Sequence, residues 1–185
     1  FTRVFSAGTS SLVTKMLLEC SKSGTAKKIG CEDFHAAAKT GTAGTSDGNT
    51  DALCVAYTPS FTVATRIGAK EGLLLNSVTG GGLPAMAVAD VLKKTDDRKD
   101  FVFNGVTTRM IDKTSYDESG KLLVCPDSVP ERYAFKAYFK EDFAPDEVSE
   151  RLSTPTATVK LEKQSDKIIF TFDAEPFITI TVFDE

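Results

Sequence analysis

The stretch Lys39-Thr40-Gly41-Thr42 directly follows the run Phe34-His35-Ala36-Ala37-Ala38 and decides how this chain is interpreted. The three alanines are small enough to pack closely on both faces of a sheet, so residues 33–42 are predicted to form a strand. Gly41 has no Cβ atom, and a substrate backbone could therefore lie against the edge of that strand. The stretch thus predicts one wall of a binding cleft on a sheet.

The polar side chains of this strand suit the binding of an anion. Lys39 would place a fixed cation in the cleft, where it could hold a neighbouring hydroxyl or attract a carboxylate. The hydroxyls of Thr40 and Thr42 can donate hydrogen bonds to that carboxylate, and a backbone N–H beyond the glycine could face a developing oxyanion. Followed by the small polar run at 43–49, the same residues are also ordinary loop composition, and this second interpretation stays open for the motif alone.

Other short segments surround the strand in a fixed order. Upstream are Arg3–Ser6 and Ser23–Ala26, and downstream are Asp51–Pro59, Phe61–Gly68 and Thr79–Ala85. The order resembles the second half of the transpeptidase domain of a class A-type penicillin-binding protein, a family in which a Lys-Thr-Gly strand is one of three active-site motifs. The resemblance covers residues 1–95, which is about half of the chain.

The chain also departs from the family. Leu53-Cys54 replaces the Trp-Phe pair that is usual there, and the chain contains no tryptophan. The family's Ser-x-x-Lys and Ser-x-Asn motifs are absent, because no serine is followed by lysine three places on or by asparagine two places on. Phe1 is not an initiator methionine, so we expect this chain to be a piece of a longer protein whose other part carries the nucleophilic serine.

The resemblance implies an α+β fold with a partial transpeptidase, or β-lactamase-like, antiparallel sheet, flanking helices and a small β-rich C-terminal module. It implies a fragment of a peptidoglycan D,D-transpeptidase, an enzyme that works by acyl transfer through a serine ester. Lys39 and Thr42 would take part in catalysis, and Lys39, Thr40, Gly41 and Thr42 would bind substrate. The chain alone is expected to be inactive, because removing the nucleophile removes the covalent route.

The resemblance also implies ligands and a location. The ligands are stem peptides that end in D-Ala-D-Ala and the β-lactams that mimic them, with no cofactor and no metal. The location is extracytoplasmic, with membrane anchoring through an upstream segment that this chain does not contain. We further expect the face that the missing half would cover to be buried by self-association, such as dimerisation or strand exchange.

Two other functions stay open. The chain could be a fragment of a serine β-lactamase or carboxypeptidase, although the long β-rich tail after residue 100 counts against that class. Alternatively, the β-rich region 101–185 could be a non-catalytic module that binds a partner or the cell wall, or that braces the enzyme. An exposed strand edge or a contiguous apolar patch would favour partner binding.

The composition changes along the chain at a polar run, residues 93–100, and the pattern beyond it is typical of β structure. We therefore predict a first domain at 1–100, the C-terminal half of a transpeptidase domain, and a β-rich region at 101–185. A further boundary is expected near residue 153, where Ser153-Thr154-Pro155 interrupts the alternation of apolar and polar residues.

Helices are predicted in two places in the first half. Thr9 or Ser10 would cap a helix that continues to about Ser21. A second helix would begin near Leu83, with Pro84 in its first turn. Apolar residues at helical spacing predict buried stripes on these helices: Leu12, Val13, Met16, Leu17 and Cys20 on the first, and Ala85, Val88, Val91 and Leu92 on the second.

Strands are predicted elsewhere. Residues 51–58 and 61–68 would form an antiparallel hairpin around Pro59-Ser60. Residues 106–112 and 121–124 would be two strands joined by a turn at 117–120. Further strands are expected from alternating apolar residues at 133–139, 157–161, 168–172 and 177–183.

Charge, hydropathy and cysteine spacing exclude several classes of function. The net charge of −4 gives no electrostatic reason to expect nucleic acid or an anionic membrane as a partner. No run of eighteen apolar residues exists, so no membrane contact by this segment is expected. The four cysteines, Cys20, Cys31, Cys54 and Cys125, lack the spacing of a zinc site. Cys20 and Cys54 are interpreted as buried thiols, and nothing in the sequence orients His35, the only histidine.

Overall fold

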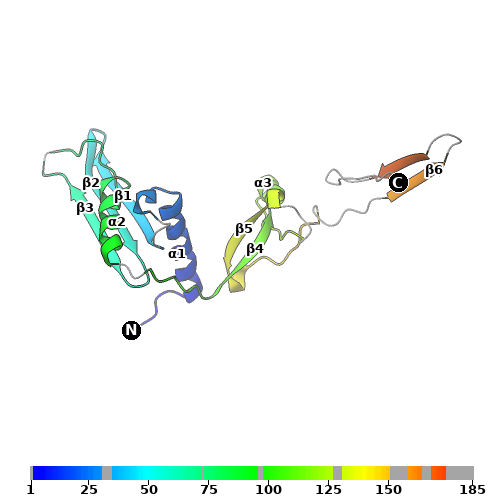
Figure 1. Ribbon diagram of the computed structural model, residues 1–185, viewed down its shortest axis with the longest axis horizontal. Coiled ribbons are helices and arrows are strands. Elements are labelled where there is room, and N and C mark those ends of the chain that lie inside the picture. The colour runs from blue at the N-terminus through cyan, green and yellow to red at the C-terminus, as the bar shows by residue number, and fades with distance from the viewer. Residues whose placement is uncertain are drawn as a thin grey trace. The chain divides into compact units, whose positions relative to one another are not determined.

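The computed structural model describes residues 2–30, 35–71, 73–95, 98–126, 131–150, 158–163 and 168–173. Within these residues the fold is α+β, with three α-helices, a three-stranded antiparallel sheet and two-stranded sheets (Figure 1). The chain divides into two compact units. The N-terminal unit is Phe1–Thr107 with Lys140–Asp142, and the C-terminal unit is Thr108–Phe139 with Phe143–Glu185.

The sheet of the N-terminal unit has the strand order β1-β2-β3 and is antiparallel throughout. Its strands are β1 (Ala37–Thr45), β2 (Gly48–Tyr57) and β3 (Thr62–Gly68). The hairpin predicted for β2 and β3 is confirmed. It closes where the Thr58 N–H donates to the Phe61 carbonyl at 2.8 Å. β1 is an outer strand, so among the described residues its outer edge has no strand partner.

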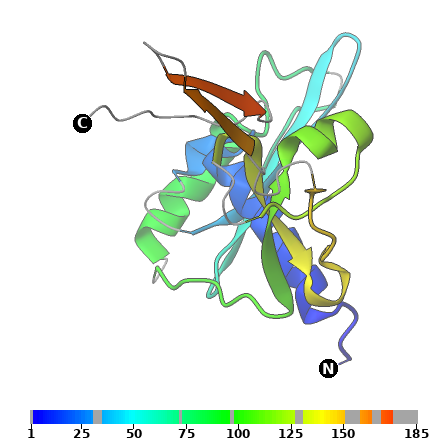
Figure 2. The same ribbon diagram turned by 90° about the vertical axis from the view of Figure 1, so that its right-hand side faces the viewer.

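The strand predicted at 33–42 is displaced. Residues 33 and 34 lie outside the described residues, and β1 runs on through Thr45 to a two-residue turn before Gly48. Figure 2 shows the tip of this β1–β2 hairpin, in cyan, extending beyond both helices of the unit. Within residues 43–49, the loop interpretation holds only for Ser46 and Asp47, which are residue types that turns favour.

The first helix, α1 (Ala7–Lys22), begins earlier than predicted. Ser6, rather than Thr9 or Ser10, is the N-cap, since it has an extended backbone and its Oγ accepts from the Thr9 N–H at 3.2 Å. This bond satisfies one of the donors that the first helical turn leaves free, and such a cap contributes about 1 kcal/mol.

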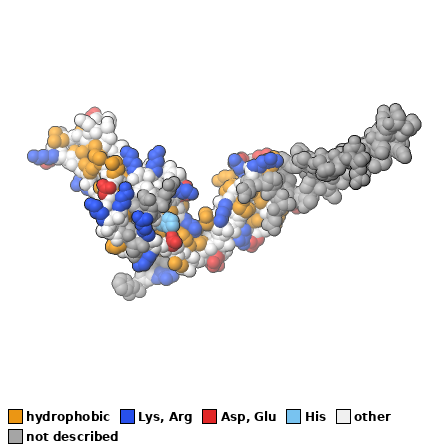
Figure 3. Space-filling model, in the orientation of Figure 1, with side chains coloured by type: hydrophobic (Ala, Val, Ile, Leu, Met, Phe, Trp, Pro, Cys, Tyr) orange, Lys and Arg blue, Asp and Glu red, His pale blue; other side chains and the backbone are white. Residues whose placement is uncertain are grey.

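The predicted buried stripe of α1 is wrong for two of its members. Val13 and Met16 are 43% and 64% exposed. The residues that α1 buries are instead small, namely Gly8, Ser11 and Ser21. Ser11 Oγ donates to the Asn104 carbonyl at 2.9 Å, so close backbone approach and hydrogen bonds help to hold α1 in place. The other members of the predicted stripe, Leu12, Leu17 and Cys20, are only partly buried. Figure 3 shows hydrophobic side chains of this unit at the surface among lysines and arginines.

The second helix, α2 (Leu83–Thr95), begins where the sequence predicts and packs against β2 and β3. Ala85, Val88 and Leu92 are buried as expected, whereas Val91 is 40% exposed. A short 3-10 turn, η1 (Lys27–Ile29), adds Ile29 to the same core. The buried cluster consists of Ala26, Ile29, Ala36, Ala38, Cys54, Ala56, Ala85, Val88, Ala89 and Leu92.

The C-terminal unit is built around β4 (Val106–Asp112) and its neighbour β5 (Ala134–Lys140), as predicted. The turn predicted at 117–120 is wrong, because a helix, α3 (Lys113–Ser119), follows β4 directly. Gly120 ends this helix in the left-handed conformation that glycine favours. The predicted strand at 121–124 is reduced to isolated bridges that Val124 makes with Ile111 and with Val148.

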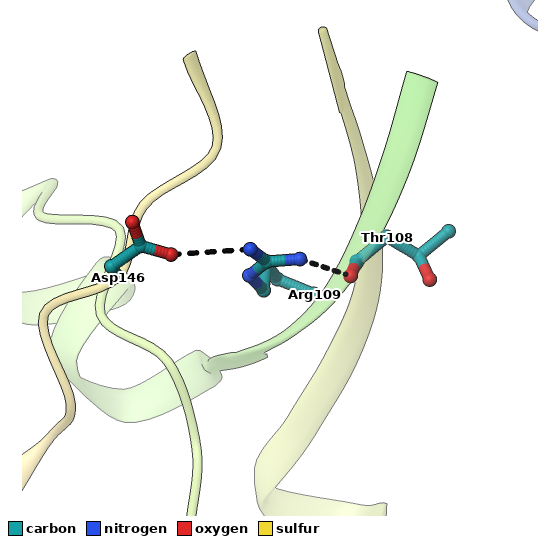
Figure 4. A network of polar contacts seen from close by, with 3 residues as sticks. All are labelled: Thr108, Arg109 and Asp146. Carbon is teal, nitrogen blue, oxygen red and sulfur yellow. Dashed lines mark hydrogen bonds and ion pairs between the residues drawn. The ribbon is translucent and has the colours of Figure 1, made fainter. Parts of the chain in front are cut away.

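An exposed ion pair links two segments of this unit (Figure 4). One Arg109 nitrogen, Nη2, lies 3.1 Å from Asp146 Oδ1, and the other, Nη1, donates to the Thr108 carbonyl at 3.1 Å. The remaining helical turns are η2 (Glu131–Tyr133) and η3 (Glu141–Phe143).

The last described strands are β6 (Thr158–Lys163) and β7 (Ile168–Asp173), which pair antiparallel. Their backbones agree with the strands predicted near 157–161 and 168–172. The boundary predicted near residue 153 and the strand predicted at 177–183 lie outside the described residues.

Candidate functional site

The four residues singled out by the sequence lie in the middle of β1. Side chains alternate across a strand, so Lys39 and Gly41 face one side of the sheet and Thr40 and Thr42 face the other. Thr40 is opposite Cys54 and Thr42 is opposite Ala52 on β2, so both hydroxyls are on the face that carries the buried core. A single ligand that touches both sets must therefore lie along the outer edge of β1.

The two threonine hydroxyls are held by segments far away in the sequence. Thr40 Oγ1 is 2.6 Å from Thr25 Oγ1, in the turn that follows α1. Thr42 Oγ1 accepts a hydrogen bond from the Gly80 N–H at 3.1 Å, just before α2. The Thr42 hydroxyl keeps its own proton for donation, because this bond uses only an acceptor lone pair. Three segments that the sequence presents separately thus meet at β1.

Two glycines at this point have different structural roles. A Cβ on Gly80 would overlap the Leu53 carbonyl oxygen and would lie 2.5 Å from the Gly41 carbonyl oxygen. Gly80 therefore lets the segment before α2 touch the sheet. A Cβ on Gly41 would meet only Leu53 side-chain atoms, at 3.9 Å, which is ordinary contact. The space beside Gly41 is open, so the packing of the unit does not require glycine there.

Lys39 supplies the cation of the site. Its side chain is exposed, and Nζ donates to the Thr40 carbonyl at 2.8 Å. The ammonium group therefore folds back on its own strand in this structure. Its stem carries several rotatable bonds, so Nζ can exchange this neutral acceptor for an anion that binds at the strand edge.

Two cysteines lie beside the threonines. Cys20 Sγ is 3.6 Å from Thr25 Oγ1, and Cys54 is opposite Thr40 in the strand register. Cys54 is buried as the sequence predicts, but Cys20 is only partly buried. Burial raises the pKa of the Cys54 thiol from 9.0 to about 11, and the nearby Cys20 adds to the rise. Cys54 is therefore a neutral thiol at physiological pH.

We expect Cys54 to make the stability of the chain fall in alkaline solution. Below its unfolded pKa of 9.0 the thiol is neutral in both states, and above it the unfolded chain loses the proton first. The free energy of unfolding should then drop by on the order of 2 kcal/mol as the pH rises towards the folded pKa. Urea unfolding at neutral and alkaline pH gives the free energy of unfolding of the wild type and of Cys54→Ala. An equal decrease with pH in both chains would contradict this role of Cys54.

The structure does orient His35, which the sequence could not predict. His35 Nδ1 contacts Asp100 Oδ1, and the two side chains are 58% and 79% exposed. They border a hollow of about 330 Å³ that Leu18, Phe101 and Phe103 also line. Sixty-five residues separate the pair, so no local pattern could have indicated it. None of these lining residues carries a hydroxyl or thiol, and the hollow therefore lacks the nucleophile that a His–Asp catalytic pair would activate.

Comparison of this chain with protein-family models, with curated proteins and with solved structures finds no match. In the described part of the chain, no helix is both long and apolar enough to cross a membrane. The described side chains also contain no group of three or more His, Cys, Asp or Glu residues that could hold a metal ion.

Proposed function

We propose that this chain is the part of a peptidoglycan D,D-transpeptidase, a penicillin-binding protein, that carries the substrate-binding strand. The observation that supports this most is the meeting of three segments at β1. Thr25 contacts Thr40, and Gly80 contacts Thr42 and packs on Gly41. Each contact joins two of the segments on which the resemblance to the family rests, and the contacts give the Lys-Thr-Gly-Thr stretch fixed surroundings that a chance loop would lack.

In this proposal β1 binds the carboxylate end of a stem peptide. Lys39 attracts the carboxylate, and the hydroxyls of Thr40 and Thr42 donate hydrogen bonds to it. The open space beside Gly41 lets the peptide backbone approach the strand edge, where it can pair as an added strand. The backbone N–H beyond Gly41 can stabilise an oxyanion. The chain itself performs no covalent step, because the family's serine motif is absent from the sequence.

A titration of the isotope-labelled chain with N-acetyl-Lys-D-Ala-D-Ala tests the proposal by NMR. We expect the largest amide shifts at residues 39–42, and smaller ones with a peptide that ends in L-Ala-L-Ala. Lys39→Met should weaken binding roughly tenfold, because a charge-assisted hydrogen bond is lost. Lys93→Met, at an exposed lysine near the end of α2, is the matched control and should change nothing.

Two results would count against the proposal. Shifts confined to residues outside β1, or equal effects of Lys39→Met and Lys93→Met, would remove β1 as the binding strand. A covalent adduct with benzylpenicillin, seen as a gain in intact mass, would show that the chain contains a nucleophile and is a complete site of another kind. We expect the intact mass to stay unchanged.

A further inference from the structure

Two thiols lie on the same side of the sheet as the Thr40 hydroxyl. Cys54 is opposite Thr40 on β2, and side chains at such positions have Cβ atoms roughly 4.5–5.5 Å apart on one face. Cys20, near the end of α1, packs against the buried cluster that contains Cys54. Both thiols are free in this structure. They differ in access, because Cys20 is partly exposed whereas Cys54 is 0% exposed.

Cys20 is also connected to the candidate site through a chain of hydrogen bonds. Cys20 Sγ is 3.6 Å from Thr25 Oγ1, and Thr25 Oγ1 is 2.6 Å from Thr40 Oγ1. Each hydroxyl has a single proton to donate. When the Cys20 S–H donates to Thr25, Thr25 can donate to Thr40, and the Thr40 proton is then available to a ligand. Only in this orientation can Thr40 donate at the strand edge, because in the reverse one its proton goes to Thr25.

We propose that Cys20 and Cys54 are a redox-sensitive pair that closes to a disulfide by exchange with a small disulfide such as oxidised glutathione, and that closure withdraws Thr25 from Thr40. The first part concerns the thiols alone. The second part rests on the proposed function, since it makes the disulfide a switch that lowers the affinity of the strand for a carboxylate ligand.

The exchange takes two steps. The more accessible partner, Cys20, attacks oxidised glutathione as a thiolate, forms a mixed disulfide and releases one glutathione thiolate. Cys54 then loses its proton to solvent and attacks the Sγ of Cys20, forming the Cys20–Cys54 bond and releasing the second glutathione. The two protein thiols are oxidised and one glutathione disulfide is reduced to two thiols, so the electrons balance.

Closure changes the donor at the candidate site. In the disulfide, Cys20 has no S–H to give, and its sulfur moves away from Thr25 towards β2. The Thr25 hydroxyl loses its thiol donor, so the Thr40 hydroxyl can donate to it instead of to a ligand. The loss of one hydrogen bond corresponds to a decrease in affinity of roughly three- to tenfold.

The chemistry is tested first on the wild-type chain. After incubation with oxidised glutathione, we expect an intact mass lower by two hydrogen atoms and a proteolytic peptide pair joined through Cys20 and Cys54. Cys54→Ala should stop at the mixed disulfide on Cys20, with one glutathionyl group added. A linked pair that uses Cys31 or Cys125, or a wild-type chain that stops at the mixed disulfide, would overturn the proposal.

The coupling is tested by NMR on the reduced and oxidised wild-type chain. Oxidation should move the methyl signals of Thr25 and Thr40, and should weaken binding of N-acetyl-Lys-D-Ala-D-Ala. Cys20→Ser, which keeps a hydroxyl donor but cannot be oxidised, should bind equally under both conditions. Unmoved methyl signals, or equal affinities of the two wild-type forms, would overturn the coupling. If the reduced chain does not bind the peptide, the proposed function fails, while the mass and methyl signals still decide on the thiol pair.

Discussion

Gly80→Ala is expected to unfold the N-terminal unit or to cost at least about 4 kcal/mol of its stability. The added Cβ would overlap the Leu53 carbonyl oxygen and lie 2.5 Å and 2.9 Å from the carbonyl oxygen and the nitrogen of Gly41. All of these are backbone atoms of the sheet, so none can move aside as a flexible side chain would. The Gly80 N–H would also lose Thr42 Oγ1 as its acceptor.

Alanine substitutions at two other glycines near Gly80 serve as controls. They test whether the loss of stability comes from the close packing of Gly80 or from replacing any glycine in this region. At Gly82 a Cβ would meet nothing closer than the Thr79 carbonyl oxygen, at 3.2 Å, and at Gly41 the nearest atoms are 3.9 Å away. Gly82→Ala makes one tight contact with a backbone oxygen and should cost less than Gly80→Ala, whereas Gly41→Ala should leave stability within about 1 kcal/mol of the wild type. Urea unfolding followed by circular dichroism measures all three variants. Similar losses for Gly80→Ala and Gly41→Ala would contradict the assigned packing.

Asp112→Ala is expected to have the largest effect in the C-terminal unit, at about 3 kcal/mol or more. The side chain is 0% exposed, yet both oxygens have donors. Oδ1 accepts from the Thr114 and Ser115 N–H groups at 2.9 Å and 3.2 Å, and Oδ2 accepts from Ser149 Oγ at 2.6 Å. Alanine would remove the acceptor of all three donors, including the Ser149 hydroxyl, whose residue is only 1% exposed.

An exposed carboxylate of the same unit is the matched control. Asp146 pairs with Arg109, but its side chain is 85% exposed, so Asp146→Ala should cost less than about 1 kcal/mol. Thermal or urea unfolding gives the free energy of unfolding of the two variants. Equal decreases would show that the burial of Asp112 does not determine the cost of its removal. The same substitution should also lower the pKa of the Cys125 thiol. Burial of Cys125 is the larger cause that raises this pKa, and the nearby charge of Asp112 adds to the rise.

The parts of the fold that the sequence predicts are those with strong local signals. The β2–β3 hairpin follows from alternation around Pro59-Ser60, and α2 follows from helical spacing after a run of glycines. The position of α1 was misjudged because capping by Ser6 depends on its backbone angles, and the exposure of Val13 and Met16 depends on contacts that small residues make elsewhere. The helix α3 was missed because its sequence is also typical of a turn, and a buried Asp112 decides between the two.

In the candidate site, too, local sequence signals can be predicted and long-range contacts cannot. Its four residues could be chosen from the sequence, because a lysine and two threonines around a glycine suit an anion on a strand. The partners of Thr40 and Thr42 could not, since Thr25 and Gly80 reach β1 only through the packing of α1 and α2 against the sheet. The contact between His35 and Asp100 joins residues with no shared periodicity or motif, so only the tertiary structure shows it.

The alternation of Lys39 and Gly41 with Thr40 and Thr42 on opposite faces of β1 has a consequence for ligand shape. A compact anion that lies over one face gains either the ammonium group or the hydroxyls, and it can gain both only at the outer edge of β1. A thin, extended chain laid along the edge reaches both faces at once. If β1 binds a stem peptide as proposed, the strand would discriminate by shape as well as by charge, and would favour extended peptides over globular molecules of the same charge.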